Sequence, residues 1–196
     1  MKILLSAFDP FGGEENNASL EAMKRIHQPA GAELKKIVVP TVFGLAGETL
    51  LNAVRKEEPD AVICLGQAAG RAAVTPERVA INVRDAAIPD NAGRKPQNED
   101  IVPGGPAAFF STLPIKAMTE AALQAGYAAA ISNSAGTFVC NDLMYTLLHA
   151  LEQEGRSIRG GFIHVPACAA PEGGPQIPTM RPETAAAALE IMLGVL

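Results

Sequence analysis

The sequence contains few cysteines, and this scarcity argues against a protein held together by disulfides or by a structural zinc ion. Cys64, Cys140 and Cys168 are the only three in 196 residues. Their odd number and the lack of paired spacings argue against a disulfide framework and against a zinc site. We therefore expect free thiols, no bound metal, and a reducing compartment, for which the cytoplasm is the natural prediction.

Long apolar runs and long basic runs are missing as well. No apolar segment approaches the roughly 20 residues of a transmembrane helix, so no membrane partner is expected. The segment "MKILLSAF" has an apolar run that is too short for a secretory signal, and it is better interpreted as a strand. A net charge of −5 without a basic block argues against binding to nucleic acid.

The sequence does contain an alternation of strand-like and helical patterns. Apolar or period-two segments predict strands at 2–8, 34–40, 60–66, 77–83, 128–134 and 160–166. Helical spacing of apolar residues predicts helices at 19–26, 47–58, 114–126 and 140–151, and an alanine-rich helix from residue 182. This order predicts an α/β fold, with one open, twisted, mainly parallel sheet and helices on both faces (an α/β/α sandwich). Because no boundary or repeat divides the chain, we expect a single domain over residues 1–196.

Ligands of such folds bind in the crevice beyond the carboxyl ends of the parallel strands. Four segments belong to that edge of the predicted sheet: "FDPFGG", "GQAAGR", "CND" and "HVPA". Polar and reactive side chains in these segments are therefore the first candidates for a functional site.

Cys140 stands in the first turn of the helix predicted at 140–151. Unpaired N–H groups and the positive end of the helix dipole stabilise a thiolate there, and the thiolate is the nucleophilic form of cysteine. The same N–H groups can hold an oxyanion. A buried structural cysteine is the alternative, since free cysteine is among the most buried residue types. Cys64, inside a predicted strand, is interpreted as such a core residue.

A nucleophilic cysteine usually needs a base, and histidine is the common one. His27 ends a predicted helix, and His149 lies about 13 Å along the helix from Cys140, which is out of reach. His164 ends the strand predicted at 160–166, at the edge of the sheet where Cys140 is expected. A histidine buried in the core for structural reasons is the alternative.

A carboxylate commonly orients the imidazole of such a pair. Glu77 begins the strand predicted at 77–83, which places it at an edge of the sheet rather than in the core. The loop acids Asp85 and Asp90 compete with it, and a solvated surface charge is the simpler interpretation of Glu77. The residues alone favour a Cys/His hydrolase and leave the acid and the substrate open.

Seven segments, spread in order over nearly the whole chain, resemble the type I pyroglutamyl peptidase (pyrrolidone-carboxylate peptidase) family. They are "FDPFGGE" (8–14), "GQAAGR" (66–71), "PERVAIN" (76–82), "IPDN" (88–91), "GGPAAFFSTLPIKAM" (104–118), "AGTFVCN" (135–141) and "GGFIHVP" (160–166). This family removes an N-terminal pyroglutamyl (5-oxoproline) residue from peptides, with a cysteine nucleophile and without metal or cofactor. The resemblance implies a single catalytic domain, a thioester intermediate, and the catalytic residues Cys140, His164 and Glu77.

The resemblance also implies how the substrate is bound and how the chain assembles. It places Phe8, Phe11 and Phe138 near the pyroglutamyl ring and makes Gln67 a hydrogen-bonding partner of the lactam. An uncharged lactam requires an apolar site with few polar groups. The expected partners are peptides with N-terminal pyroglutamate and further copies of this chain, in a homo-oligomer that is often a tetramer in the family.

The chain departs from the family's sequence at several positions, which brings the rate rather than the reaction into question. Ala18 stands where proline is common, Asp142 where histidine is frequent, and Ala87 where arginine is common. Arg84 or Arg94 could replace the arginine missing at position 87, but the site is expected to work without one. The alternatives to a pyroglutamyl peptidase are a related hydrolase or acyl-transferase with another substrate, or a catalytically silent binding protein on the same fold.

Overall fold

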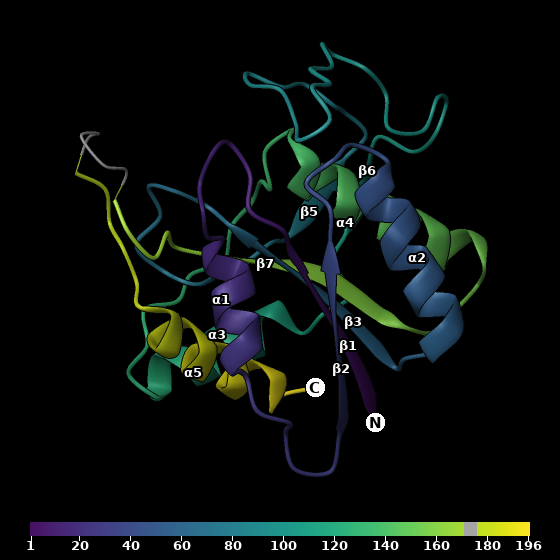
Figure 1. Ribbon diagram of the computed structural model, residues 1–196. Coiled ribbons are helices and arrows are strands. Elements are labelled where there is room, and N and C mark those ends of the chain that lie inside the picture. Colours follow the sequence, from purple (N-terminus) through teal and green to yellow (C-terminus); the bar gives the residue numbers. More distant parts are fainter. Residues whose placement is uncertain (171–175) are drawn as a thin grey trace.

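A twisted five-stranded sheet forms the centre of the protein in the computed structural model, which describes residues 1–170 and 176–196 (Figure 1). The strands lie in the order β2-β1-β3-β7-β4, and each neighbouring pair is parallel except β4 with β7. Their bounds are β1 (Lys2–Phe8), β2 (Glu33–Val39), β3 (Ala61–Gln67), β4 (Thr75–Pro76) and β7 (Arg159–Val165). The predicted mainly parallel α/β sheet is confirmed.

Helices cover both faces of this sheet. They are α1 (Ala18–Arg25), α2 (Leu45–Glu57), α3 (Ile115–Gln124), α4 (Val139–Gln153) and α5 (Pro182–Leu193). Helices α1, α3 and α5 pack on one face, and α2 and α4 pack on the other (Figure 1). Within the described ranges, none of these helices is long and apolar enough to cross a membrane.

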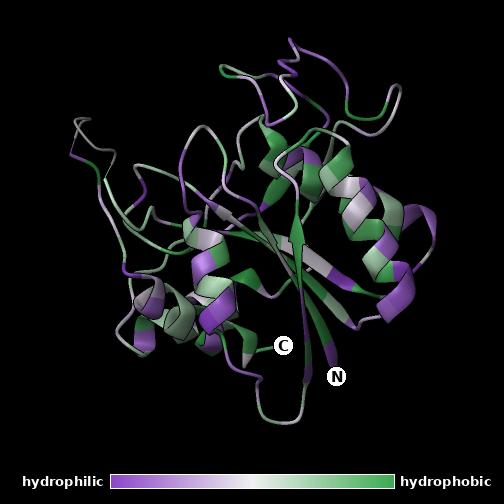
Figure 2. Cartoon of the chain, in the orientation of Figure 1, coloured by the Kyte–Doolittle hydropathy of each residue, from purple (hydrophilic) through white to green (hydrophobic). Residues whose placement is uncertain are grey.

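Alternate residues of each strand supply the two cores. In β1, Ile3 and Leu5 face α1, α3 and α5, whereas Leu4 and Phe8 face α2 and α4. Successive side chains of a strand point to opposite faces, so a sheet covered on both sides needs continuously apolar strands. Figure 2 shows the result, with hydrophobic strands at the centre and hydrophilic residues on the outer faces of the helices.

The prediction of a strand at 128–134 is wrong. This segment makes only two isolated parallel bridges, Val74 with Ala129 and Glu77 with Ser132. Hydrogen bonds of a short parallel ladder are nevertheless present, including Ser132 N–H to the carbonyl of Pro76 at 3.0 Å. Pro76 stands where the next backbone N–H of the ladder is needed, and proline has none. The ladder is interrupted there, and the segment stays irregular.

The strand predicted at 77–83 is shorter than expected and lies outside the main sheet. It comprises β5 (Val79–Ile81), which pairs with β6 (Ala108–Phe110) in a separate antiparallel sheet. Glu77 precedes β5 and is completely buried, with 0% of its surface exposed. The expectation that Glu77 lies at an edge rather than in the core is therefore wrong.

Candidate active site

A cavity of about 180 Å³ opens at the carboxyl ends of β1, β3 and β7. It is lined by Phe8, Phe11, Asn17, Thr41, Gln67, Ala135, Phe138, Cys140 and His164. Six of these residues are the ones that sequence reasoning singled out, and they come from segments far apart in the chain. Their meeting place is the crevice that a parallel α/β sheet offers to ligands.

Cys140 lies in the first turn of α4, as the sequence predicts, and the helix begins one residue earlier, at Val139. No side chain caps this helix, so the N–H groups of its first turn depend on other acceptors. The thiol also lies close to the neighbouring strand, because a Cβ on Gly66 would stand 3.2 Å from its Sγ and 2.7 Å from the ring of Phe162. Gly66 pairs with His164 in the register of β3 and β7. The absence of a side chain at Gly66 thus lets the start of α4 approach β3, the neighbour of the strand that carries His164.

The residue after the cysteine, Asn141, ties the first turn of α4 to β5. Its side chain accepts a hydrogen bond from the backbone N–H of Ile81 at 2.9 Å. It also donates to the carbonyl oxygens of Ile81 at 2.9 Å and Val83 at 3.0 Å. Asn141 is almost completely buried, so these bonds satisfy all the polar atoms of its side chain. They hold Cys140 in a fixed place relative to the small sheet.

Asp142 makes a second connection from the same turn. Its carboxylate is completely buried and accepts hydrogen bonds from the backbone N–H of Gly44 at 2.8 Å and from Nε of Arg84 at 2.6 Å. The side chain of Arg84 is only 14% exposed. The departure from the family at position 142 therefore forms a buried ion pair that joins α4 to the loop after β5 and to the start of α2.

We expect Arg84→Met to lower the free energy of unfolding by about 3 kcal/mol, because it leaves the Asp142 carboxylate buried without its counter-charge. Chemical denaturation measures this loss. Arg94→Met is the matched control from the same loop, because the Arg94–Glu99 pair is exposed and should contribute less than about 1 kcal/mol. Equal stability of the two variants would contradict a stabilising role for the buried pair.

His164 and Glu77 are in direct contact inside the protein. Nδ1 of His164 lies 2.7 Å from Oε1 of Glu77, and both side chains are buried. The competing acids lie elsewhere. Asp85 is exposed, and the carboxylate of Asp90 accepts the backbone N–H groups of Phe43, Ala92 and Arg94. The structure therefore brings Glu77, and neither loop acid, to His164.

Arg71 is a contact of Glu77 that sequence reasoning missed. Its Nη1 donates to Oε1 of Glu77 at 2.5 Å and to Oγ1 of Thr75 at 2.6 Å, and its Nη2 donates to the carbonyl of Ser134 at 3.1 Å. The residue ends the segment "GQAAGR", but nothing local in that segment indicates its partner. The cation beside the buried acid thus comes from the β3–β4 connection.

Burial determines the resting charges of the site. It raises the pKa of the Cys140 thiol to about 12, and the charge of Glu77 adds to this change. Burial also lowers the pKa of His164, although the hydrogen bond to Glu77 opposes that effect. Burial alone would raise the pKa of Glu77, but the hydrogen bond and charge of His164 hold it below its ordinary value. Burial thus favours a neutral thiol and a neutral imidazole beside an ionised Glu77, and it opposes the stabilisation of a thiolate by the start of α4.

Aromatic side chains form the apolar part of the cavity. The ring centroids of Phe11 and Phe138 lie 6.0 Å apart, and the ring of Phe43 makes an edge-on contact with Phe138 at 5.2 Å. Phe8 is buried, and its ring centroid lies 6.2 Å from that of Phe162. These rings give the cavity an apolar wall that suits a small, largely apolar group.

Few polar atoms face this cavity, and most of them are already used. The amide oxygen of Gln67 accepts the backbone N–H of Ala18 at 2.7 Å, so its NH₂ end remains as a donor. Asn17 and Thr41, which the sequence analysis did not select, also line the cavity. Asn17 caps α1 through Ser19, and the hydroxyl of Thr41 donates to Asp9 at 2.7 Å. An N-cap pattern before α1 is the one local signal that marks Asn17.

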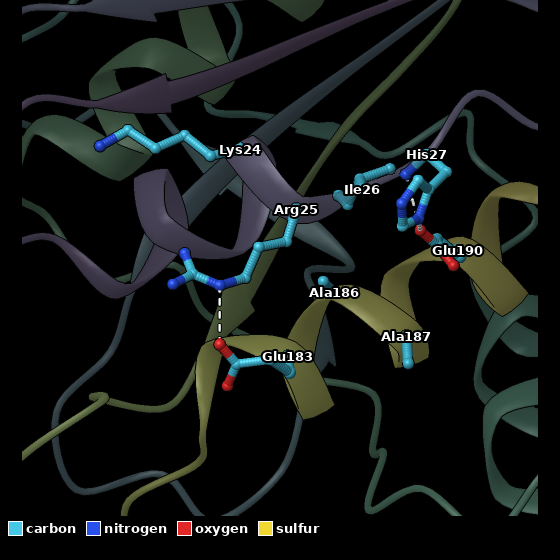
Figure 3. Close-up of a pocket in the computed structure, with 8 residues that line it drawn as sticks. All are labelled: Lys24, Arg25, Ile26, His27, Glu183, Ala186, Ala187 and Glu190. Atoms are coloured by element: carbon cyan, nitrogen blue, oxygen red, sulfur yellow. Dashed lines mark hydrogen bonds and ion pairs between the residues drawn. The ribbon is translucent and has the colours of Figure 1, made fainter.

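The other two histidines have partners of their own. His149 packs against Tyr145 and Phe109. His27 contributes to a larger hollow of about 400 Å³ between α1 and α5 (Figure 3). There its Nδ1 lies 2.9 Å from Glu190, and its side chain is 90% exposed. Neither histidine shares the cavity of Cys140, as the sequence predicts.

The remaining candidates from the sequence lie away from the cavity. Cys64 is completely buried in the core, as expected, and Cys168 lines a different hollow. Ala87 is exposed. Both nearby guanidinium groups are paired with carboxylates, Arg84 with Asp142 and Arg94 with Glu99. Within the parts of the chain that the structure describes, no group of three or more His, Cys, Asp or Glu side chains is arranged to hold a metal ion.

Comparisons with known proteins agree with this geometry. The family model for pyroglutamyl peptidase matches residues 1–196. Pyrrolidone-carboxylate peptidase of Enterococcus faecalis is 53% identical over 167 residues, which cover 85% of this chain and 78% of the relative. The crystal structure of Bacillus amyloliquefaciens pyroglutamyl peptidase I is 46% identical with a TM-score of 0.92, over 98% of this chain and 95% of that one.

A mutant pyrrolidone carboxyl peptidase of Pyrococcus furiosus is 40% identical with a TM-score of 0.93, over all of this chain and 97% of that one. Likeness of sequence and of backbone thus extends over the complete fold, including the strand ends that form the cavity. The family resemblance predicted from seven segments is confirmed. The chain belongs to the pyroglutamyl peptidase family.

Proposed function

We propose that this protein is a cysteine peptidase that removes an N-terminal pyroglutamyl residue from peptides, with Cys140 as nucleophile, His164 as base and Glu77 as the group that orients His164. The single observation that carries this proposal is the small aromatic cavity that ends in a thiol and an imidazole hydrogen-bonded to a buried carboxylate. Membership of the pyroglutamyl peptidase family supports the substrate class.

The reaction begins from a neutral thiol and a neutral imidazole. Because Glu77 is ionised, it accepts the Nδ1–H of His164, which leaves Nε2 as the basic nitrogen. Nε2 takes the proton of Cys140 as Sγ attacks the carbonyl carbon that joins pyroglutamate to the next residue. The imidazolium then gives this proton to the leaving amine as the C–N bond breaks. Backbone N–H groups in the first turn of α4 are candidates to stabilise the oxyanion.

A thioester between Cys140 and the pyroglutamyl group is the intermediate of this scheme. Water attacks its carbonyl while Nε2 of His164 accepts a proton from that water. The C–S bond breaks, the proton returns to sulfur, and free pyroglutamate leaves. Glu77 keeps its negative charge throughout and stabilises each imidazolium stage.

The cavity suits a neutral lactam and disfavours an ordinary amino terminus. The five-membered ring of pyroglutamate is small and nearly flat, and Phe11 and Phe138 offer it apolar surface at the wall of the cavity. Its carbonyl is matched by the free NH₂ end of Gln67, which can donate a hydrogen bond. A charged ammonium group would lose its water there without gaining a partner, and such burial costs several kcal/mol.

Hydrolysis of fluorogenic amides tests the substrate class. Pyroglutamyl amide and prolyl amide have the same ring size, but the second carries a secondary ammonium in place of the lactam. We expect kcat/KM to favour the pyroglutamyl amide by at least roughly 10³-fold, as a site built around a polar group of the substrate rejects its analogue. Comparable rates on both amides would contradict the proposed specificity and favour a hydrolase with another substrate.

Glu77→Gln should lower kcat roughly 10²- to 10⁴-fold, because the amide keeps the size of the side chain but loses the charge that stabilises the imidazolium. Steady-state kinetics measures this effect. Asp85→Asn is the matched control, since Asp85 is an exposed acid of the neighbouring loop and should retain the wild-type rate. If Asp85→Asn were the slower of the two variants, the assignment of the orienting acid would be wrong.

We propose that residues 1–196 form a single catalytic domain. We also propose that the protein acts in the cytoplasm and that it assembles into a homo-tetramer. The N-terminal strand β1 and the C-terminal helix α5 pack in one core, which supports one domain. The cytoplasm is supported by the need to keep the Cys140 thiol reduced. The tetramer follows from family resemblance, and light scattering on the purified protein tests it.

A further inference from the structure

We propose that Arg71 is a positioning residue of this active site, which holds the Glu77 carboxylate against His164 and ties it to the turn that leads to Cys140. This inference rests on the proposed function for the reaction that the site performs. It adds a residue that neither the composition of the site nor the local sequence around Glu77 indicates.

Arg71 and His164 share one oxygen of the buried acid. Oε1 of Glu77 lies 2.5 Å from Nη1 of Arg71 and 2.7 Å from Nδ1 of His164. Nη1 also donates to Oγ1 of Thr75, two residues before the acid. A guanidinium is planar and rigid, so these contacts fix the direction in which the carboxylate points. The lone pair of Oε1 is thereby kept available to the imidazole.

Charge balance gives Arg71 a second role. Glu77 is completely buried and needs a cation, but His164 is neutral in the resting site. Arg71, with 28% of its side chain exposed, provides that cation and keeps contact with solvent. Without Arg71, the pKa of His164 would rise and more of the imidazole would carry a proton, and an imidazolium cannot accept the proton of the thiol. Arg71 therefore preserves His164 as a base.

A third contact links this pair to the nucleophile. Nη2 of Arg71 donates to the carbonyl of Ser134 at 3.1 Å, and the next residue, Ala135, lines the cavity. This stretch is the irregular one, where Pro76 interrupts the ladder between residues 74–78 and 128–132. The guanidinium thus adds a fixed connection at the point where backbone pairing is incomplete.

The charged groups around His164 and Cys140 predict how the pKa values of these two residues change when Arg71 is removed. Glu77 and Arg71 act on His164, and the groups that act on Cys140 are Glu77, Arg71 and Cys64. The positive charge of Arg71 lowers the pKa of His164 and also lowers the pKa of the Cys140 thiol. Its removal should raise both values. The pH range of activity should then move upward at its acidic and its basic limit.

The test compares Arg71→Met with Arg71→Lys, and uses Arg78→Met as the matched control. Arg78 also joins the two irregular segments, through Nε to Asn133 at 2.7 Å, but it does not touch the acid. We expect Arg71→Met to lower kcat on a pyroglutamyl amide about 10- to 100-fold at pH 7, with a smaller change in KM. Arg78→Met should remain near wild type.

Two further measurements separate positioning from simple stabilisation. In Arg71→Met, both limits of the kcat/KM profile should move to higher pH, and iodoacetamide should label Cys140 up to about tenfold more slowly at pH 7. Peptide mapping identifies which thiol is labelled. Arg71→Lys keeps the charge and loses the planar fork, so it should restore the pH profile and recover only part of kcat.

A folded Arg71→Met variant with a wild-type pH profile and wild-type labelling of Cys140 would overturn the proposal, even if kcat fell. If Arg71→Met does not fold, the Arg71→Lys variant provides the test. A full wild-type kcat in Arg71→Lys would show that the planar guanidinium is not needed to position Glu77, and would overturn the positioning role. Labelling of Cys140 requires no turnover. The proposed function would fail separately, if the wild-type protein cleaved no pyroglutamyl amide.

Discussion

Cys140→Ala should abolish hydrolysis of a pyroglutamyl amide, with kcat falling roughly 10⁵- to 10⁶-fold, the size typical of losing a nucleophile. Cys140 is the thiol that lines the aromatic cavity, and alanine at this position has no atom that can attack the carbonyl. The loss should leave the fold intact, because the backbone of the turn is held by the buried side chains of Asn141 and Asp142. Steady-state kinetics measures the loss of kcat, and thermal denaturation of the same sample measures whether the fold is retained.

Cys168→Ser is the matched control for the nucleophile. Cys168 is a free, half-buried cysteine that lines a different hollow, and its replacement should leave kcat within about twofold of wild type. An alkylating reagent should inactivate the Cys168→Ser variant as it does the wild type. Normal turnover by Cys140→Ala would mean that another group attacks the substrate, and the proposed mechanism would be abandoned.

His164→Ala should reduce kcat by roughly 10⁵-fold at pH 7, the size typical of losing a base that acts together with its nucleophile. Burial raises the pKa of the Cys140 thiol to about 12, so without a base this thiol stays protonated and poorly nucleophilic at that pH. The rate of this variant should therefore rise about tenfold per pH unit between pH 7 and 9.

The wild-type profile should differ in shape. Burial places the pKa of His164 below its ordinary value of about 6.5, so the imidazole is neutral and basic at pH 7. On the acidic side, activity should be lost as the pH falls through that lowered pKa, where the base becomes protonated. His27→Asn is the control, because His27 is exposed between α1 and α5 and should not change the profile. A wild-type profile in His164→Ala would place the base elsewhere.

Much of the fold follows from patterns that are local in the sequence. Continuously apolar segments such as 60–66 predict strands covered on both faces, and the structure confirms this for β3. The prediction fails at 128–134, where pairing depends on a partner strand that contains Pro76. A missing backbone N–H in another part of the chain is not visible in the pattern of the segment itself.

The sequence by itself determined the fold class, the place of Cys140 at a helix start and the place of His164 at a strand end. These features depend on residue spacing, which the chain carries locally. Family resemblance added the choice of Glu77. Only the tertiary structure decided that Glu77 is buried, that Arg71 is its counter-charge, and that burial raises the pKa of the Cys140 thiol. Burial and charge compensation depend on atoms from distant segments that exclude water together, so no local pattern could reveal them.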